Sequence, residues 1–175
     1  MPTLLLFLCG LAGFGLLISF VTHVAALFGA RILSDELFMV LVIGVFVLGL
    51  PTVLASNRLV RDVPQRDYWQ ATFRGCSPWM RSASLGIFLY AIVNFILLAL
   101  AGSSEGEPSH GLSSAALAVT GLLMLFYAMH GATLYSAARV WHESGDVECP
   151  NGHKVNPLSK FCNQCGQPVS RQGGR

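Results

Sequence analysis

Four long apolar stretches alternate with shorter polar segments along this chain. They cover residues 4–28, 37–55, 84–101 and 113–138, and none of them contains Asp, Glu, Lys or Arg. A helix needs about 20 apolar residues to cross the hydrocarbon of a bilayer, so each stretch predicts a transmembrane helix. The pattern therefore predicts an all-α membrane protein in which residues 1–138 form a four-transmembrane-helix bundle.

Helix-start chemistry precedes two of these stretches. Ser34 stands before two acidic residues, which is typical of an N-cap and a first turn. Ser77 followed by Pro78 is typical of an N-cap and a proline at the first helical position, so the third helix is expected to begin near Pro78. Pro51 is expected to bend or fray the last turn of the second helix. The first stretch is too long for a signal-peptide core and no Lys or Arg precedes it, so we expect it to be retained.

Composition excludes a soluble domain. Hydrophobic residues make up 53% of the 175 positions and charged residues 11%, whereas soluble domains carry about 25% charged residues. A soluble fold of this size leaves too much surface in water to hide so many apolar side chains. The bilayer is therefore expected to solvate most of them.

Basic residues gather on one side of the predicted bundle. The 56–83 loop holds Arg58, Arg61, Arg66, Arg74 and Arg81. The tail after residue 138 holds Arg139, Lys154, Lys160, Arg171 and Arg175. The 102–112 loop holds none, so ten of the eleven basic residues share one side and Arg31 alone lies on the other. By the positive-inside rule, we expect a multi-pass protein of the bacterial plasma (inner) membrane with the 56–83 loop and both termini in the cytosol.

The cytosolic loop carries a pattern of its own. Trp69, Phe73 and Cys76 lie at i, i+4 and i+7, which favours a short amphipathic helix in the headgroup region. The same residues are equally typical of a loop tethered by its aromatic side chains, and this is the interpretation we prefer. A third interpretation is a docking surface for another membrane protein. Trp79 adds an interfacial anchor.

The chain's clearest chemistry follows the last apolar stretch. Cys149 and His153 have the spacing C-x3-H, and Cys162 and Cys165 have the spacing C-x2-C. Three cysteines and one histidine, presented in pairs by tight turns, suit a tetrahedral zinc ion. A segment of this length cannot fold on hydrophobic burial alone and needs a metal or disulfides. Spacing does not distinguish zinc from iron, although three thiolates and an imidazole favour zinc.

These residues resemble the short zinc ribbons at the ends of many bacterial membrane proteins. The likeness covers residues 149–169 and consists of CPNGH, a spacer, and FCxxCG. It implies a treble-turn or two-hairpin module around a structural Zn²⁺ held by Cys149, His153, Cys162 and Cys165. It implies no catalytic activity, because a closed shell of four protein ligands leaves no position for a reactive water. A redox role for C-x2-C is the alternative, but it requires a thioredoxin-like βαβ setting. Residues 139–148 are expected to be a linker and residues 170–175 a disordered tail.

Polar residues inside the spans are weaker candidates for a site. We expect His23, His130 and Asn94 to form hydrogen bonds between helices, although membrane-embedded ionisable groups are functional candidates by default. A haem shared by the two histidines is excluded, because their predicted depths differ by roughly 18 Å. No acidic or basic residue lies deep in a span, which disfavours a proton-coupled transporter.

The pattern as a whole favours a non-enzymatic membrane protein. Its expected partners are the lipid bilayer and a protein that binds the ribbon or the cytosolic loop. Small residues at spacing four, as in Ala128, Ala132 and Ser136, permit close packing within the bundle or a homo-oligomer. The near-neutral tail predicts no nucleic-acid binding. Two alternatives stay open: an accessory subunit of a membrane enzyme or transport complex, and a membrane enzyme that uses His23, His130 or His142.

Overall fold

The structure is a computed structural model that describes residues 2–30, 32–60, 63–102, 108–144, 147–155, 161–162 and 164–169. It contains four long helices: α1 (Pro2–Leu27), α2 (Asp35–Val60), α4 (Pro78–Gly102) and α5 (Pro108–Ser144). All four are long and apolar enough to cross a membrane, as the four apolar stretches predict. Shorter elements are a 3-10 turn (Gln65–Asp67), α3 (Tyr68–Thr72), β1 (Val147–Glu148) and β2 (Lys154–Val155).

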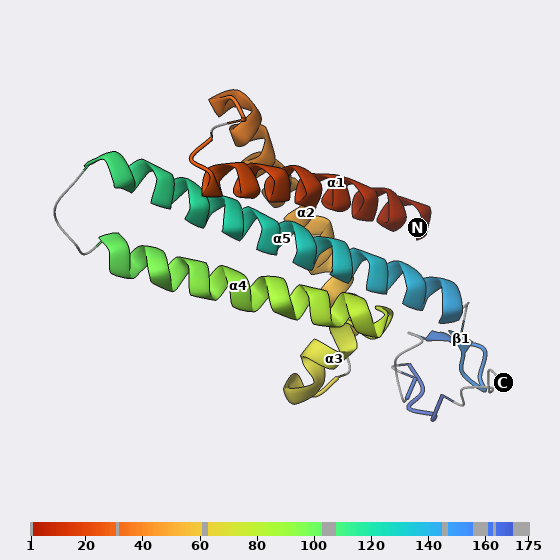
Figure 1. The fold of residues 1–175 in the computed structure, drawn as a ribbon. Helices are drawn as coiled ribbons and strands as arrows, with labels where there is room; N and C mark the ends of the chain where they lie inside the picture. The colour runs from red at the N-terminus through yellow and green to blue at the C-terminus, as the bar shows by residue number, and fades with distance from the viewer. Residues whose placement is uncertain are drawn as a thin grey trace.

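Helix α5 is the centre of the arrangement. Helices α1, α2 and α4 all pack against α5, whereas α4 makes no extensive contact with α1 or α2 in the described part of the chain. Figure 1 shows α5 running between α1 and α4, with α2 behind it. Within the apolar spans, 56% of α5 is buried inside the protein, compared with 17% of α1 and 11% of α4. The predicted four-helix bundle is therefore built as three helices around one.

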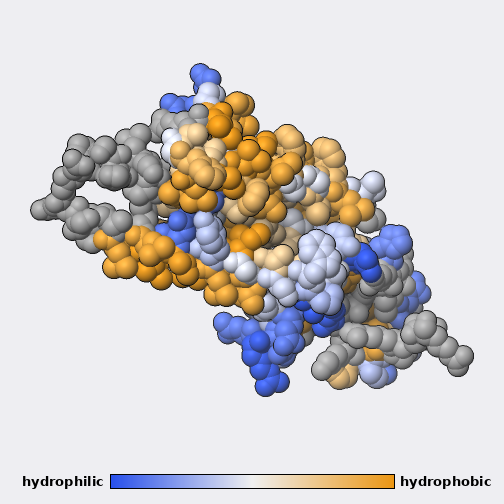
Figure 2. Space-filling model, in the orientation of Figure 1, coloured by the Kyte–Doolittle hydropathy of each residue, from blue (hydrophilic) through white to orange (hydrophobic). Residues whose placement is uncertain are grey.

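The outer surface of these helices is broadly apolar. Figure 2 shows hydrophobic residues over most of the helical part and hydrophilic residues gathered around α3. Large side chains such as Phe46 (75% exposed) and Leu100 (66% exposed) point away from the protein. Exposed apolar area of this extent is what a bilayer covers.

Neighbouring helices in the sequence run in opposite directions. Helix α1 is antiparallel to α5, because the Cys9 thiol reaches the Gly131 carbonyl while His23 reaches Thr120. Helix α4 is also antiparallel to α5, since Asn94 bonds to the Leu117 carbonyl and the turn just before α4 contacts α5 near its far end. Helix α2 runs parallel to α5, because Tyr127 bonds to Leu41 near one end and Arg58 lies over the Trp141 ring near the other. This alternation is the one that four consecutive membrane crossings require.

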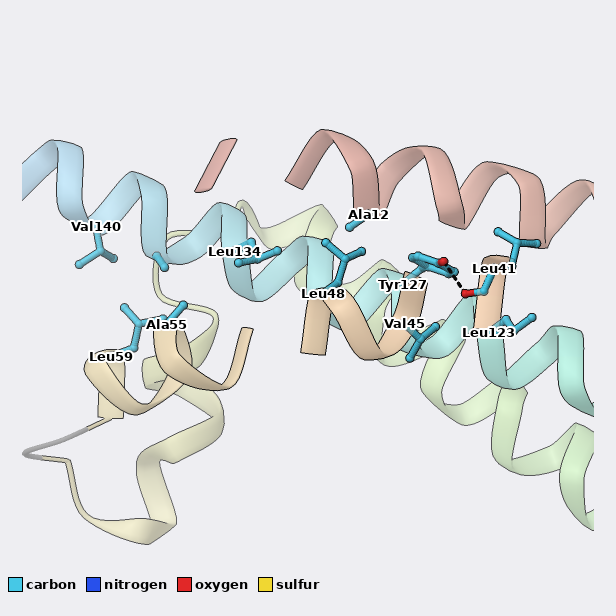
Figure 3. Packing of buried hydrophobic residues seen from close by; sticks show 11 residues of the cluster. Ala12, Leu41, Val45, Leu48, Ala55, Leu59, Leu123, Tyr127, Leu134 and Val140 are labelled. Carbon is cyan, nitrogen blue, oxygen red and sulfur yellow. Dashed lines mark hydrogen bonds between the residues drawn. The ribbon is translucent and has the colours of Figure 1, made fainter. Parts of the chain in front are cut away.

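The main apolar core lies between α1, α2 and α5, and a close view of it is given in Figure 3. Its buried members are Ala12, Leu41, Val45, Leu48, Ala55, Leu59, Leu123, Tyr127, Leu134, Ala137 and Val140. Tyr127 fills the space beside two glycines, because a Cβ on Gly15 or on Gly44 would collide with its side chain. Its hydroxyl donates to the Leu41 carbonyl at 2.7 Å. One tyrosine thus joins α5 to both α1 and α2.

Small residues on α5 serve packing inside the protein. Ala128, Ala132 and Ser136 are 8%, 4% and 0% exposed. Ala132 and Ser136 contact the turn that precedes α4, where the Gly75 N–H donates to Ser136 Oγ at 3.0 Å. The Cys76 thiol donates to the Ala132 carbonyl at 3.2 Å. This spacing therefore supports contacts within one chain.

The 56–83 loop differs from the amphipathic helix that its spacing favours. Helix α3 ends at Thr72, and residues 73–76 form a turn. Phe73 (2% exposed) and Cys76 (4% exposed) are buried against α5, so they do not face a membrane surface. Trp69 packs on Phe73 with ring centroids 4.5 Å apart. The loop is tethered by its aromatic side chains, as the preferred interpretation expected.

The helices also extend beyond the predicted spans. Helix α2 continues past Pro51 to Val60 without ending, because Ala55 and Leu59 join the core beyond the proline. Helix α4 begins at Pro78, where the Ser-Pro pair predicts it. Helix α5 reaches Ser144, so the first six residues of the predicted 139–148 linker are helical. The predicted tail, 170–175, lies outside the described residues.

Candidate metal centre

The first two candidate ligands are presented by a hairpin. Strands β1 and β2 pair antiparallel, with Glu148 opposite Lys154. Between them the Cys149 N–H donates to the His153 carbonyl at 3.0 Å, and the Gly152 N–H donates to the Cys149 carbonyl at 2.8 Å. The turn needs Gly152 because its φ is +75°, a conformation that glycine adopts without steric cost. The hairpin brings Cys149 and His153 to the same side of the turn.

The second pair is presented in the same way. Phe161 and Pro168 form an antiparallel bridge. Inside it the Cys162 N–H donates to the Gln167 carbonyl, and the Gly166 N–H donates to the Cys162 carbonyl, both at 2.8 Å. Gly166 has a φ of +70°. The second turn is therefore closed by a similar pair of hydrogen bonds, each of which spans one more residue than in the first turn.

The four ligand atoms converge on one point. Each lies within 4.8 Å of the others, so the group could hold a metal ion. Cys149 Sγ lies 3.5 Å from His153 Nδ1 and 3.7 Å from Cys165 Sγ. Cys162 Sγ lies 3.8 Å from His153 Nδ1. A tetrahedral ion bound at about 2.3 Å to sulfur and about 2.0 Å to nitrogen separates two sulfurs by about 3.8 Å and sulfur from nitrogen by about 3.5 Å.

The surroundings of the thiols favour charge on one of them. Burial raises the pKa of Cys162, but backbone N–H groups of Gln164 and Cys165, together with the neighbouring thiols, outweigh it and lower the pKa to about 6. At Cys165 the Gln167 N–H lowers the pKa, while burial and the thiols of Cys162 and Cys149 raise it, and the net direction is upward. A bound cation would remove this competition between neighbouring thiols for negative charge, because it stabilises several thiolates at once.

A small apolar cluster supports the ligands. Cys149, Val155 and Cys162 are 4%, 8% and 3% exposed, and Val169 packs against them. Phe161 lies beside this cluster in the sequence, yet its side chain is 60% exposed. The module is therefore tightly built around its ligands and carries an aromatic residue on its outside.

Apart from the metal-ligand cluster, a group of polar side chains that includes His23 links three helices. His23 is 3% exposed. Its Nδ1 lies 2.8 Å from Thr120 Oγ1, and its Nε2 bonds to the Tyr90 hydroxyl. Because the Thr120 hydroxyl donates to the Leu117 carbonyl at 3.2 Å, it accepts from Nδ1–H, and Tyr90 O–H then donates to Nε2. The network is saturated, which identifies His23 as a link between helices.

Sequence reasoning found His23 but missed Tyr90 and Thr120 as its partners. Their hydroxyls have no signature along the chain, and the pairing depends on the register between α1, α4 and α5. Asn94, one turn beyond Tyr90, donates to the Leu117 carbonyl at 2.9 Å. The predicted bonds of His23 and Asn94 between helices are thus present.

The remaining histidines do not join this group. His130 lies ten residues beyond Thr120 on α5, a separation of roughly 15 Å along the helix. The two span histidines therefore cannot share one iron, as expected. His130 stacks on Phe126, and its Nε2 is buried without a partner among the described residues. His142 is exposed in the last turns of α5.

The comparisons with known proteins add no relative. No protein-family model, no curated protein and no solved structure matches this chain.

Proposed function

We propose that this chain is a non-enzymatic, multi-pass protein of the bacterial plasma membrane that binds a protein partner through a cytosolic zinc ribbon. The observation that carries the proposal is the convergence of Cys149, His153, Cys162 and Cys165 on one point. Four protein ligands close the coordination shell, so the ion organises the fold and leaves no site for substrate or water. Three thiolates and one imidazole suit Zn²⁺ best among the common ions.

Orientation supports a cytosolic ribbon. The C-terminal part of α5 lies beside Arg58 of α2 and beside the turn between α3 and α4, which Arg74 and Arg81 flank, and the ribbon follows α5 in the sequence. The positive-inside rule places that end of a multi-pass protein in the cytosol. Free thiols also persist as zinc ligands in a reducing compartment, whereas they oxidise in the periplasm.

Phe161 supports a role in protein binding. Its side chain is 60% exposed, so the ring is accessible to a partner. Aromatic residues, Phe among them, are enriched at the core of protein interfaces relative to the rest of the surface. Phe161 is not a ligand, so its contribution to binding can be separated from that of the metal.

The test is crosslinking and pull-down from native membranes, with metal content measured on the same samples. Cys162→Ser combined with Cys165→Ser is expected to lose zinc and the partner together. Phe161→Ala is expected to retain zinc and lose the partner, and Cys9→Ala, which removes a thiol inside the first span, is expected to retain both. If the partner stays bound to the zinc-free chain, the helical part carries the interaction and the chain is an accessory subunit with the ribbon as a cap.

A further inference from the structure

The turn between α3 and α4 is held in place by α5. Phe73 and Cys76 are buried, and Gly75 lies so close to α5 that an added Cβ would come within 2.6 Å of the Ser136 carbonyl oxygen. The Gly75 N–H donates to Ser136 Oγ at 3.0 Å. A turn packed this closely holds the residues on either side of it in fixed positions.

Two of those residues are arginines that the turn brings together. Arg81, in the first turn of α4, folds back so that its Nη2 donates to the Arg74 carbonyl at 3.0 Å and its Nε to the Cys76 carbonyl at 3.2 Å. These bonds use part of the guanidinium and leave its other N–H groups available. Arg74 is exposed beside it. The fold thus holds the Arg81 guanidinium against the backbone of Arg74, and both residues are exposed at this turn.

No carboxylate among the described residues forms an ion pair with either arginine. Asp67, one of the two acidic residues of this loop, lies 3.6 Å from Arg66 and pairs with it. Like charges held together repel each other unless an anion lies between them. Within the described part of the chain no side chain supplies such an anion, so a bound anion would relieve the repulsion between nearby arginines.

Arg74 and Arg81 also lie at the boundary between the polar loop and the apolar surface of the helices. Trp79 is 71% exposed and Trp69 is 46% exposed on the same loop, and tryptophan prefers the boundary between headgroups and hydrocarbon. Leu85, which is 46% exposed, begins the apolar surface of α4 four residues after Arg81, or roughly 6 Å along the axis. In Figure 2 the hydrophilic surface around α3 borders this apolar surface. Arg74 and Arg81 thus lie at the depth of lipid phosphates.

We propose that Arg74 and Arg81 bind the phosphate of an anionic phospholipid in the leaflet at this end, with Trp79 beside its acyl chains. Arginine binds phosphate through parallel N–H bonds, which suits the N–H groups that Arg81 leaves free. Two arginines that form an ion pair with no carboxylate in the described ranges favour a headgroup with net negative charge over a zwitterionic one. The site is separate from the ribbon, so it holds whether or not the ribbon binds a protein.

The test measures lipid bound to the purified full-length chain by native mass spectrometry, with phosphatidylglycerol and phosphatidylcholine supplied at equal concentration. The wild-type chain is expected to retain phosphatidylglycerol preferentially. Each arginine near a charged leaflet contributes about 1 kcal/mol, so Arg74→Gln is expected to weaken that retention about fivefold. The double change with Arg81→Gln is expected to weaken it about thirtyfold. Arg66→Gln is the matched control, because Arg66 lies on the same loop but pairs with Asp67.

Several outcomes overturn the proposal. They are equal retention of the two lipids by the wild-type chain, an unchanged preference in Arg74→Gln, or an equal loss in Arg66→Gln. Displacement of the lipid by millimolar inorganic phosphate also overturns it, because the site is then a free-anion site. If loss of the Arg81 bonds to the turn prevents folding of the double variant, the Arg74→Gln result decides by itself, since the side chain of Arg74 forms no bond to the turn among the residues that the structure describes.

Discussion

Tyr127 occupies space that two glycines leave open, and this contact decides how close α1 and α2 come to α5. A Cβ at Gly15 would overlap the Tyr127 ring. Gly15→Ala is therefore expected to push the ring away and weaken its 2.7 Å bond to the Leu41 carbonyl. Overpacking of this kind lowers the free energy of unfolding by about 1–3 kcal/mol. Titration of the purified protein in mixed micelles with a denaturing detergent measures the loss.

Gly13→Ala is the control for this prediction. Gly13 lies in the same helix, and nothing lies within 4 Å of the Cβ that the substitution adds. Alanine is also the better helix former, so the stability of this variant is expected to equal or slightly exceed that of the wild type. Equal losses in Gly13→Ala and Gly15→Ala would show that the Tyr127 contact does not limit the packing.

At this scale the sequence predicted the residues whose chemistry is visible without their neighbours. Cys149, His153, Cys162 and Cys165 have a spacing that only a few kinds of site require. Tyr127 has no comparable signature, because its role arises from glycines that lie 112 and 83 positions away in the chain. Contacts of this kind depend on helix register, which hydrophobic periodicity does not specify.

The turn before α4 is an element whose shape comes from the helix that it touches. Gly75→Ala would place a Cβ 2.6 Å from the Ser136 carbonyl oxygen, which is backbone and cannot move aside. The turn is expected to detach from α5 and expose Cys76, which is 4% exposed in the wild type. The rate of maleimide labelling at Cys76, followed by peptide mass spectrometry, is expected to rise at least tenfold, in line with the loss of about 1.4 kcal/mol or more of protection.

Gly86→Ala is the matched control, because its Cβ meets nothing within 4 Å and it lies in α4 close to the same turn. Its Cys76 is expected to label as slowly as in the wild-type chain. Fast labelling in the Gly86 variant would mean that any added methyl group near α4 loosens the turn, and slow labelling in both would mean that the turn tolerates the Gly75 collision.

The ribbon is an element that depends on its metal. Its strands have two residues each, and a module this small lacks the apolar core to fold alone. Removal of the ion with a chelator, or Cys162→Ser, is expected to unfold the ribbon and leave the four long helices intact. Trypsin is then expected to cut after Lys154 much faster, while the helical circular dichroism signal stays nearly constant. Cys9→Ala should retain both the metal and resistance to cleavage.

Helices were predictable where the hydrophobic pattern along the chain is strong. Their ends were less predictable where tertiary contacts determine them. Long uncharged runs predict the four helices, because bilayer thickness sets their minimum length. The end of α3 at Thr72 was not predictable, since Trp69, Phe73 and Cys76 fit a longer helix equally well. Burial of Phe73 against α5 selects the turn. The extension of α5 to Ser144 has a similar origin, because Val140 packs in the core beyond the predicted end of the span.

At the scale of the whole molecule, the position of α5 explains why its sequence differs from the others. A helix surrounded by three partners needs small side chains where they approach closely, and polar groups there must find partners. Ala128, Ala132 and Ser136 meet the first need, and Thr120 and Tyr127 meet the second. The small residues indicated close packing. They did not indicate which helix would be central, because mean hydropathy is the same for the α4 and α5 spans.

The orientation of the molecule is the prediction on which the zinc proposal depends. With four alternating helices and the arginines at one end, both termini are expected in the cytosol. A green fluorescent protein fused after Arg175 should fluoresce, and alkaline phosphatase inserted in the 103–107 segment should be active. Inactive phosphatase there, together with active phosphatase after Arg175, would invert the topology. The three ribbon thiols would then face an oxidising compartment, where disulfides replace thiolate ligands, and the ribbon could not be a zinc-organised cytosolic module.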